Sequence, residues 1–276
     1  IFEDISTSSG IAKNNYWSNG VTMVDINGDD FLDIYISNGG MIKSENELYI
    51  NNGDLTFSNQ AKSYGLNDKS KSMQACFFDM DKDDDLDLFV MNHSSYQRMN
   101  ALSFDSTMAN LSKEDYYFEC NHLYENLGNS KFKDISKEAG VLKPGYGLGL
   151  NCSDLDDDGW VDIYVANDFF VPDFLYKNNG DKLFNDEIKT TTSHISFFSM
   201  GCDVADINND GLLDISVVDM ASSDHIRSKT LMASMDVQKF DILKNYLGYQ
   251  SQFMFNSLQM NVGNGIFSEI SQYAGI

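Results

Sequence analysis

The stretch DLDDDGWVDIYVAND at residues 154–168 decides the fold, because it places a nine-residue acidic loop directly before a run of strand-forming residues. The same loop pattern recurs as DINGDDFLD at 25–33, DMDKDDDLD at 79–87 and DINNDGLLD at 206–214. Each copy follows an apolar segment and precedes IYIS, LFVM, IYVA or ISVV, which are runs typical of β-strands. The repeated unit is therefore predicted to be strand, acidic loop, strand.

A second pattern follows every loop, as NELYINNGDLTF at 46–57, NHLYENLGNSKF at 121–132, DFLYKNNGDKLF at 173–184 and NSLQMNVGNGIF at 256–267. It is typical of a hairpin, because an apolar-aromatic strand leads into Asn and Gly, which tolerate the positive φ angles of a tight turn. Two hairpins per repeat predict a four-stranded unit.

Two of the repeats contain insertions. Successive loops begin 54, 75 and 52 residues apart, and the distance from loop to hairpin is long in the second and fourth repeats. The insertions are expected at about 93–120 and about 221–255, and loops of that length are commonly functional. Within the second one, helical spacing predicts a short helix capped by Asp236 and ended by Gly248, with Val237, Phe240, Leu243 and Leu247 on one face.

These units predict an all-β fold, a β-propeller of four-stranded blades with calcium-binding loops. The opening segment IFEDISTSSGI matches the repeat tails FKDISKEAGV and FSEISQYAGI, so residues 1–276 are expected to form one propeller region of about four blades plus a remnant. Because propellers close with four to eight blades, the chain is expected to be an arc of a larger ring. A sandwich is the alternative, and it does not require one unit to recur.

The spacing D-x-[DN]-x-D-x-x-x-D predicts a Ca²⁺ site in each loop. Side-chain oxygens at positions one, three and five converge as the chain turns, position seven offers a backbone carbonyl, and the Asp at position nine can bind through both oxygens. The alternatives are Mg²⁺, which demands tighter octahedral geometry, and acidic turns that hold no metal. The predicted ligands are Asp25, Asn27, Asp29, Phe31 and Asp33; Asp79, Asp81, Asp83, Asp85 and Asp87; Asp154, Asp156, Asp158, Trp160 and Asp162; and Asp206, Asn208, Asp210, Leu212 and Asp214.

The acidic composition disfavours nucleic acid and anionic membranes as binding partners. The formal charge of −23, from 42 acidic against 19 basic residues, would repel nucleic acid and anionic membranes. No apolar stretch is long enough for a membrane-spanning helix, and an export signal or lipid anchor would lie upstream of the opening residues. The cysteines show no zinc-binding spacing. Three of them precede acidic loops and are expected to be small buried residues rather than disulfides, and Cys120 stays unassigned.

The paired signatures, DLDDDGWVDIYVAND followed by LYKNNGDKLF, resemble the FG-GAP or VCBS repeats of integrin-like propellers. More narrowly, MGCDVADINNDGLLDISVVDM and FNSLQMNVGNGIFSEISQYAGI resemble the ASPIC/UnbV-type, cartilage-acidic-protein-like proteins abundant in Bacteroidetes. The resemblance implies a propeller of seven blades, calcium in the loops and a secreted or outer-membrane-anchored protein. It also implies recognition of a glycan or a protein partner at the cell surface, near nutrient-uptake machinery.

The leading hypothesis is a calcium-stabilised binding and scaffold module without catalytic residues. Its recognition face is expected to include Asn167, Asp168, Phe169 and Phe170 with Asp224, His225 and Arg227, although these residues could equally be structural. The alternative is a polysaccharide lyase or hydrolase on a propeller scaffold. The histidines are scattered and no nucleophile motif is present, which favours the binding module.

Overall fold

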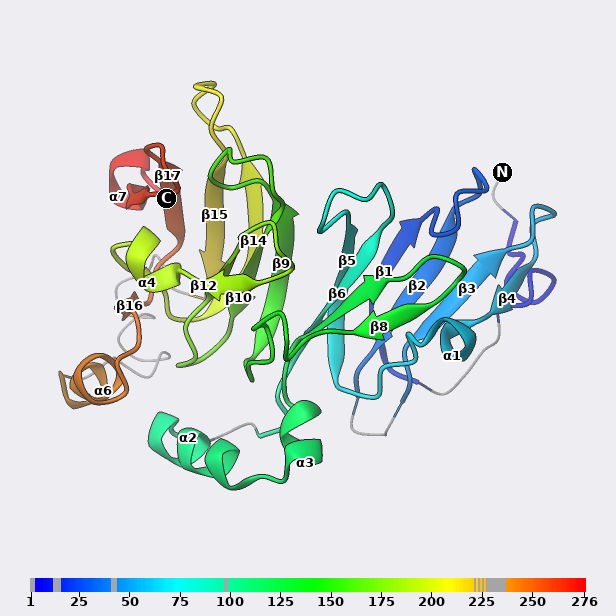
Figure 1. Cartoon of the computed structure of the whole chain (residues 1–276). Helices are drawn as coiled ribbons and strands as arrows, with labels where there is room; N and C mark the ends of the chain where they lie inside the picture. Colours follow the sequence, from blue (N-terminus) through cyan, green and yellow to red (C-terminus); the bar gives the residue numbers. More distant parts are fainter. Residues whose placement is uncertain are drawn as a thin grey trace. The chain divides into compact units, whose positions relative to one another are not determined.

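The computed structural model describes residues 3–11, 16–40, 44–96, 99–220, 222, 224, 226 and 237–276. The chain divides into two compact units (Figure 1). Unit 1 comprises residues 1–95 and 114–144, and unit 2 comprises residues 96–113 and 145–276. Each unit contains two four-stranded antiparallel sheets.

Both sheets of unit 1 are meanders in which each strand pairs with the next along the chain. The first sheet holds β1 (Ser18–Val24), β2 (Asp33–Asn38), β3 (Glu47–Asn51) and β4 (Phe57–Asn59), followed by helix α1 (Ala61–Tyr64). The second sheet holds β5 (Ser72–Phe78), β6 (Asp87–Asn92), β7 (His122–Asn126) and β8 (Phe132–Asp134).

Unit 2 repeats this arrangement. Its first sheet holds β9 (Gly147–Ser153), β10 (Asp162–Asn167), β11 (Phe174–Asn178) and β12 (Phe184–Asp186), followed by α4 (Ile188–Thr191). Its second sheet holds β14 (Ser199–Ala205), β15 (Asp214–Asp219), β17 (Ser257–Asn261) and β18 (Phe267–Glu269), followed by α7 (Ser271–Ala274). A short parallel pair, β13 (Ile195–Ser196) with β16 (Gln252–Phe253), forms a separate two-stranded sheet in this unit.

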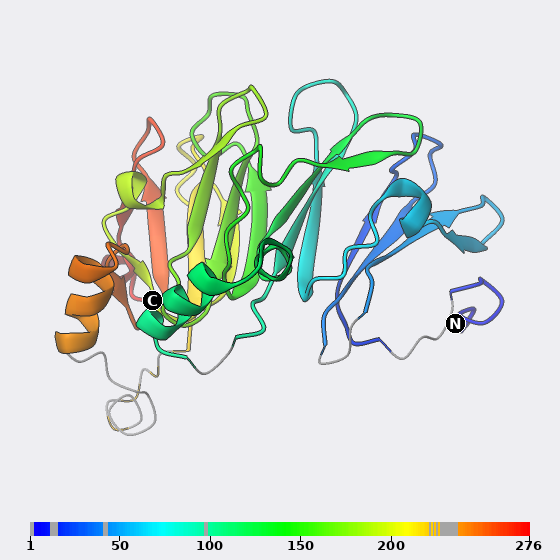
Figure 2. The same cartoon turned by 60° about the horizontal axis from the view of Figure 1, so that its bottom comes forward.

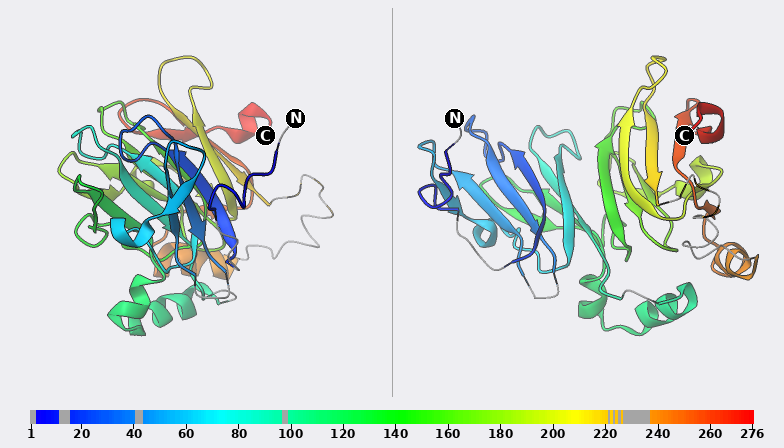
Figure 3. Two further views of the ribbon diagram at one scale, coloured as in Figure 1. Left: turned by 90° about the vertical axis from the view of Figure 1, so that its right-hand side faces the viewer. Right: turned by 180° about the vertical axis from the view of Figure 1, so that it is seen from behind.

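The prediction of four-stranded, blade-like units is thereby confirmed, with an acidic loop before the second strand of every sheet. Strands β6 and β10 are buried at every residue, as expected for strands covered on both faces. In each unit the two sheets stack face to face on an apolar core (Figure 3). Unit 1 packs Tyr35 and Leu48 with Leu88 and Val90, whereas unit 2 packs Tyr164 and Leu175 with Ile215 and Val217.

The insertions contain helices, visible in Figure 2. In the second, α6 (Val237–Asp241) continues into the π-helical turn η1 (Ile242–Tyr246), and Gly248 follows at φ 68°. The predicted helix and its glycine stop are thus present, while the predicted cap Asp236 lies outside the described residues.

The first insertion, for which the sequence pattern predicts no helix, holds α2 (Ala101–Asn110) and α3 (Lys113–Tyr117). Asn100 caps α2 by accepting a hydrogen bond from the Ser103 N–H at 2.9 Å. Phe104 and Met108 are buried on one face of α2, so a capped amphipathic helix forms here as well.

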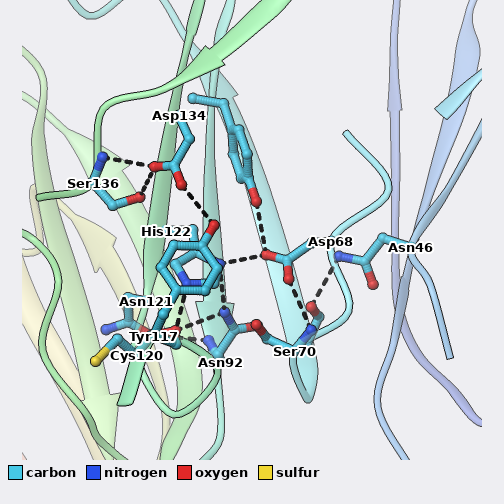
Figure 4. Close-up of polar contacts among 12 residues, drawn as sticks. Asn46, Asp68, Ser70, Asn92, Tyr117, Cys120, Asn121, His122, Asp134 and Ser136 are labelled. Atoms are coloured by element: carbon cyan, nitrogen blue, oxygen red, sulfur yellow. Dashed lines mark hydrogen bonds and ion pairs between the residues drawn. The ribbon is translucent and has the colours of Figure 1, made fainter. Parts of the chain in front are cut away.

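A buried ionic network joins the two sheets of unit 1 (Figure 4). Asp68, in the segment between β4 and β5, accepts hydrogen bonds from His122 Nδ1 at 2.5 Å and from the Tyr124 hydroxyl at 3.0 Å. The other ring nitrogen, Nε2, donates to the Tyr117 carbonyl at 3.0 Å. Burial alone would lower the pKa of His122, but the neighbouring charge of Asp68 raises it above its usual value.

The four cysteines carry free thiols. Cys76, Cys152 and Cys202 lie half-buried on the first strand of their sheets, and Cys120 is buried. The three cysteines that precede acidic loops were expected to be buried and are only half-buried. Among the described residues, no helix is long and apolar enough to cross a lipid bilayer.

Candidate metal centres

Each acidic loop folds around its first carboxylate. In the third loop, Asp154 Oδ1 accepts from the Asp158 N–H at 3.1 Å and Asp154 Oδ2 accepts from the Gly159 N–H at 2.8 Å. Asp25 and Asp206 accept from positions five and six of their loops in the same way. Asp79 differs slightly, because it accepts from the Lys82 and Asp84 N–H groups at 2.7 and 3.3 Å.

Position six has the left-handed backbone that the sharp turn requires. Gly159 and Gly211 have φ of 85° and 89°, and Asp30 and Asp84 have φ of 69° and 68°. Asp tolerates this region better than most residues with a Cβ atom. The first two loops therefore keep the turn without glycine.

Positions five and seven are fixed together. The N–H of position seven donates to the position-five carboxylate in every loop, at 2.9 Å from Phe31, Trp160 and Leu212 and at 3.1 Å from Asp85. In the first and fourth loops the position-three amide also contacts position five, because Asn27 and Asn208 Nδ2 donate to the neighbouring Asp at 3.0 and 2.8 Å. Positions three and five are thus already adjacent.

The Asp at position nine connects the loop to the third strand of its sheet, a contact that the sequence pattern did not reveal. In every loop one oxygen of this Asp accepts from the N–H of position two, and the other accepts from the backbone N–H of the Asn that ends the third strand of the sheet. The first distances are 3.2, 3.0, 3.1 and 3.0 Å and the second are 2.8, 2.8, 2.9 and 2.8 Å, for Asp33, Asp87, Asp162 and Asp214 in turn. The two sequence motifs of each repeat therefore meet at this carboxylate.

Burial raises the pKa of the position-nine carboxyl groups Asp33, Asp87 and Asp162, which disfavours their charged form. Burial, together with the charges of neighbouring loop aspartates, raises the pKa of Asp87 and Asp162 to about 7. In the second loop, burial and then the neighbouring Asp83 raise the pKa of Asp85 to about 6. Acids crowded in this way would gain most from a cation that neutralises them together.

Two of the loops bring three carboxylates into metal-binding reach. One oxygen each from Asp79, Asp81 and Asp87 lies within 4.8 Å of the others, and so do oxygens from Asp154, Asp156 and Asp162. These are positions one, three and nine. The first and fourth loops have Asn27 and Asn208 at position three, so an amide oxygen takes the place of one carboxylate there.

The donor set fits calcium. Every side-chain donor is a hard oxygen, and the loops supply them from a flexible turn between strands, which suits a cation that takes six to eight oxygen ligands. The side chains at positions one, three, five and nine and the carbonyl at position seven would hold the ion. Its role there would be to neutralise the clustered acids and fix the turn of each sheet.

The predicted recognition face is only partly surface. Asn167 is 1% exposed, and its amide bridges the Tyr146 N–H and the Pro172 carbonyl, so its role is structural and its placement on the face was wrong. Asp168 is also buried. Asp224 is exposed, and His225 and Arg227 lie outside the described residues.

Phe169 and Phe170 instead line a cavity of about 730 Å³ in unit 2. Phe169 is 36% exposed and has φ of 59°, a conformation uncommon for a residue with a bulky side chain. The cavity lies between the two insertions, since α2 and the α6–η1 segment both contribute to it. The lining also includes Met99, Leu102, Phe197, Phe198, Lys239 and Ile242.

Comparison with known proteins identifies the repeats. The family described as FG-GAP-like repeat matches residues 25–90 and 154–217, and each match spans two acidic loops and the hairpin between them. No curated protein matches the chain. Among solved structures, the crystal structure of the V. cholerae biofilm matrix protein Bap1 is similar with a TM-score of 0.33 and 12% identity, over 79% of this chain and 37% of that one. The chain thus spans well under half the length of Bap1. The two matched regions, with their loops and hairpins, are FG-GAP-like repeats.

Proposed function

We propose that the chain is a calcium-stabilised binding and scaffold module of an exported protein, whose partner docks at the cavity between the two insertions. The observation that carries this proposal is that cavity. Its lining is mostly apolar, the two insertions supply part of it, and it presents a partly exposed phenylalanine. Concave apolar sites with a few polar groups are the usual form of a binding pocket.

The walls of the cavity are held in place by the surrounding structure. The N–H groups of Phe197 and Phe198 donate to Asp219 Oδ2 at 3.2 and 3.0 Å. The Phe197 N–H also donates to the Phe253 carbonyl of β16 at 2.9 Å. On α2, Phe104 packs its ring 5.5 Å from that of Phe170. A site fixed in advance loses little freedom when a ligand binds.

The lining favours a partner with an apolar anchor. Phenylalanine and aliphatic side chains give contact area without donors or acceptors, and Lys239 supplies a positive charge 4.6 Å from the Phe197 ring centroid. An apolar side chain beside a carboxylate in a polypeptide partner matches this combination. A sugar ring that stacks on Phe169 would use the same residue.

Phe169→Gly is the variant that tests the site. It removes the exposed ring at a position where the positive φ suits glycine, so the fold is expected to persist. The wild type and this variant would be compared, with calcium present, on peptide arrays and by affinity electrophoresis in gels containing polysaccharides. Binding that the variant loses supports the site and tells which partner class it takes. Equal binding by both proteins, or none by the wild type, would overturn the proposal.

The proposal includes location at the cell surface or outside the cell, near an outer-membrane uptake system, and the absence of catalysis. Membrane fractionation of cells that make the full protein tests the location. Incubation with the same polysaccharides tests the enzyme alternative. New unsaturated or reducing ends would show a lyase or hydrolase and contradict a purely binding role.

A further inference from the structure

A lysine contacts the third acidic loop from a neighbouring strand. The residue type at this strand position differs in every repeat. Lys177 lies on β11, and its ammonium contacts the Asp156 carboxylate and lies 3.4 Å from Asp158 Oδ2. These are positions three and five of the loop. Strand register places Ile50, Glu125 and Met260 at the matching position of the other sheets.

The ammonium and a bound cation would occupy the same small space. Asp156, Asp162 and Lys177 line one cavity of about 120 Å³ in unit 2. The hairpin turn at 264–267 of the next sheet closes it, and a Cβ atom added to Gly265 would lie 2.9 Å from Asp156 Cβ. With roughly 30 Å³ per water, the cavity holds only a few small groups. The Asp156 side chain is 8% exposed, so solvent screens this pair only weakly.

The charge of the loop explains why a lysine fits there. The third loop has Asp156 at position three, where the first and fourth loops have the uncharged Asn27 and Asn208. One ammonium offsets that additional carboxylate. The second loop also has an aspartate, Asp81, at position three, but Glu125 at the lysine's strand position adds negative charge.

We infer that Lys177 is a built-in counter-cation of the third loop, which holds positions three and five together without metal and must leave them when calcium enters. This inference rests on the proposed calcium binding by the loops. It predicts that the loops differ in calcium affinity. The third loop must break the ion pair with Lys177 to bind calcium, whereas the other loops have no lysine at the matching strand position. The lysine therefore weakens calcium binding by the third loop and makes the shape of this loop less dependent on calcium.

Trp160 provides a reporter for this loop alone. It occupies position seven of the third loop, and the only other tryptophan is Trp17, so Trp17→Phe leaves one tryptophan in the chain. Selective tryptophan excitation should then sensitise the emission of Tb³⁺ bound in the third loop, and calcium should displace it. The calcium concentration at half displacement measures the affinity of this site.

Lys177→Met, which copies the fourth sheet, is expected to raise the calcium affinity of the third loop roughly tenfold. Lys177→Arg keeps the charge and should leave the affinity within about twofold of the wild type. Lys189→Met removes one charge from the same unit at a residue that donates to the Gly248 carbonyl and not to a loop, so it corrects for net charge. Circular dichroism establishes that each variant is folded.

Met260→Lys makes the reciprocal change, because it places a lysine beside the fourth loop. It should weaken calcium binding at that loop, so that calorimetry counts one bound calcium fewer. If Lys177→Met binds no more tightly than Lys189→Met, the inference is overturned while the proposed function stands. If calorimetry detects no calcium binding to the wild type, both the proposed calcium binding by the loops and the role inferred for Lys177 are wrong. A selective gain in Lys177→Met, with loss in Met260→Lys, supports both.

Discussion

Asp68 and His122 form an ion pair inside unit 1, with Asp68 Oδ2 2.5 Å from His122 Nδ1 and both side chains 1% exposed or less. The pair lowers the pKa of Asp68, chiefly through the charge of His122 acting against burial, and Asp68 raises the pKa of His122. It lies where the two sheets of this unit meet. Removing one partner of a buried pair leaves an uncompensated charge, which costs about 3–5 kcal/mol.

The pair predicts a pH dependence of stability. Because the folded-state pKa of His122 is raised, its contribution is complete below its unfolded pKa of about 6.5 and is lost as the pH rises through the folded value. Asp68 acts in the opposite range, since its lowered pKa contributes above about pH 3.9 and is lost on strong acidification. The free energy of urea unfolding of unit 1 should therefore fall as the pH rises above about 6.5.

His122→Gln should remove this decline above about pH 6.5 and lower stability below it. His93→Gln is the matched control. Burial lowers the pKa of His93, so its charge opposes folding only below about pH 6.5, and its loss should leave the alkaline decline intact. A decline that persists in His122→Gln would contradict the assignment of His122 as the titrating group.

Calcium removal should lower the melting temperature. At a hundredfold excess over Kd, each site that binds only the folded chain contributes about 2.7 kcal/mol, so emptying one is expected to lower Tm by ~5–10 °C. The expected affinity lies in the weak extracellular range of about 10⁻⁴ to 10⁻³ M. Differential scanning calorimetry in chelator, in calcium and in equal magnesium measures the effect. Magnesium should restore less of the melting temperature than calcium does. An unchanged Tm in chelator would contradict stabilisation of the fold by calcium.

Phe169→Gly is expected to change the free energy of unfolding of unit 2 by less than about 1–2 kcal/mol, because the relief of the positive φ offsets the lost contacts of the ring with Tyr146 and Phe198. Phe170→Ala is the contrasting change, because Phe170 is 6% exposed and packs on Phe104 and Tyr146. It should cost about 3–5 kcal/mol. Thermal unfolding of both variants measures the difference, and a large loss in Phe169→Gly would mean that its ring is part of the core.

The loops, hairpins and four-stranded units were predictable because each depends on residues adjacent in sequence. Position nine begins the second strand in every sheet, as Asp162 does in β10, and the turns have the glycines and asparagines that positive φ requires. The helix of the second insertion was predictable for the same local reason. Helix α2 has similar local signals in Asn100, Phe104 and Met108, but these residues lie outside the repeated motifs.

What could not be predicted depends on residues that meet only after folding. Asp68 and His122 are 54 positions apart, and Asp68 lies outside the repeated motifs, so the hairpin pattern that contains His122 does not indicate its partner. The cavity combines α2, Phe169 and α6 from separate parts of the chain. The burial of Asn167 was missed because its neighbours Tyr146 and Pro172 bond to its amide from outside the motif.

Asn261→Ala tests whether neighbouring sheets of unit 2 support each other's acidic loops. Asn261 is 2% exposed, and its amide donates to the Leu213 carbonyl of its own loop at 3.1 Å and to the Leu155 carbonyl of the third loop at 2.8 Å. It also accepts from the Gly263 N–H at 2.9 Å. The variant leaves these buried groups unpaired and should cost about 2–4 kcal/mol.

Asn126→Ala is the matched control, because Asn126 makes the same two hairpin bonds, to the Leu86 carbonyl at 3.2 Å and from the Gly128 N–H at 3.0 Å, within its own sheet. Its expected cost is about 1–2 kcal/mol. Leu155 is position two of the third loop, so Asn261→Ala should also weaken calcium binding by this loop, which Trp160 reports. Asn126→Ala should not weaken it. Equal losses of stability in the two variants, with terbium binding unchanged in both, would mean that the bond to Leu155 contributes nothing and that each loop is held by its own sheet alone.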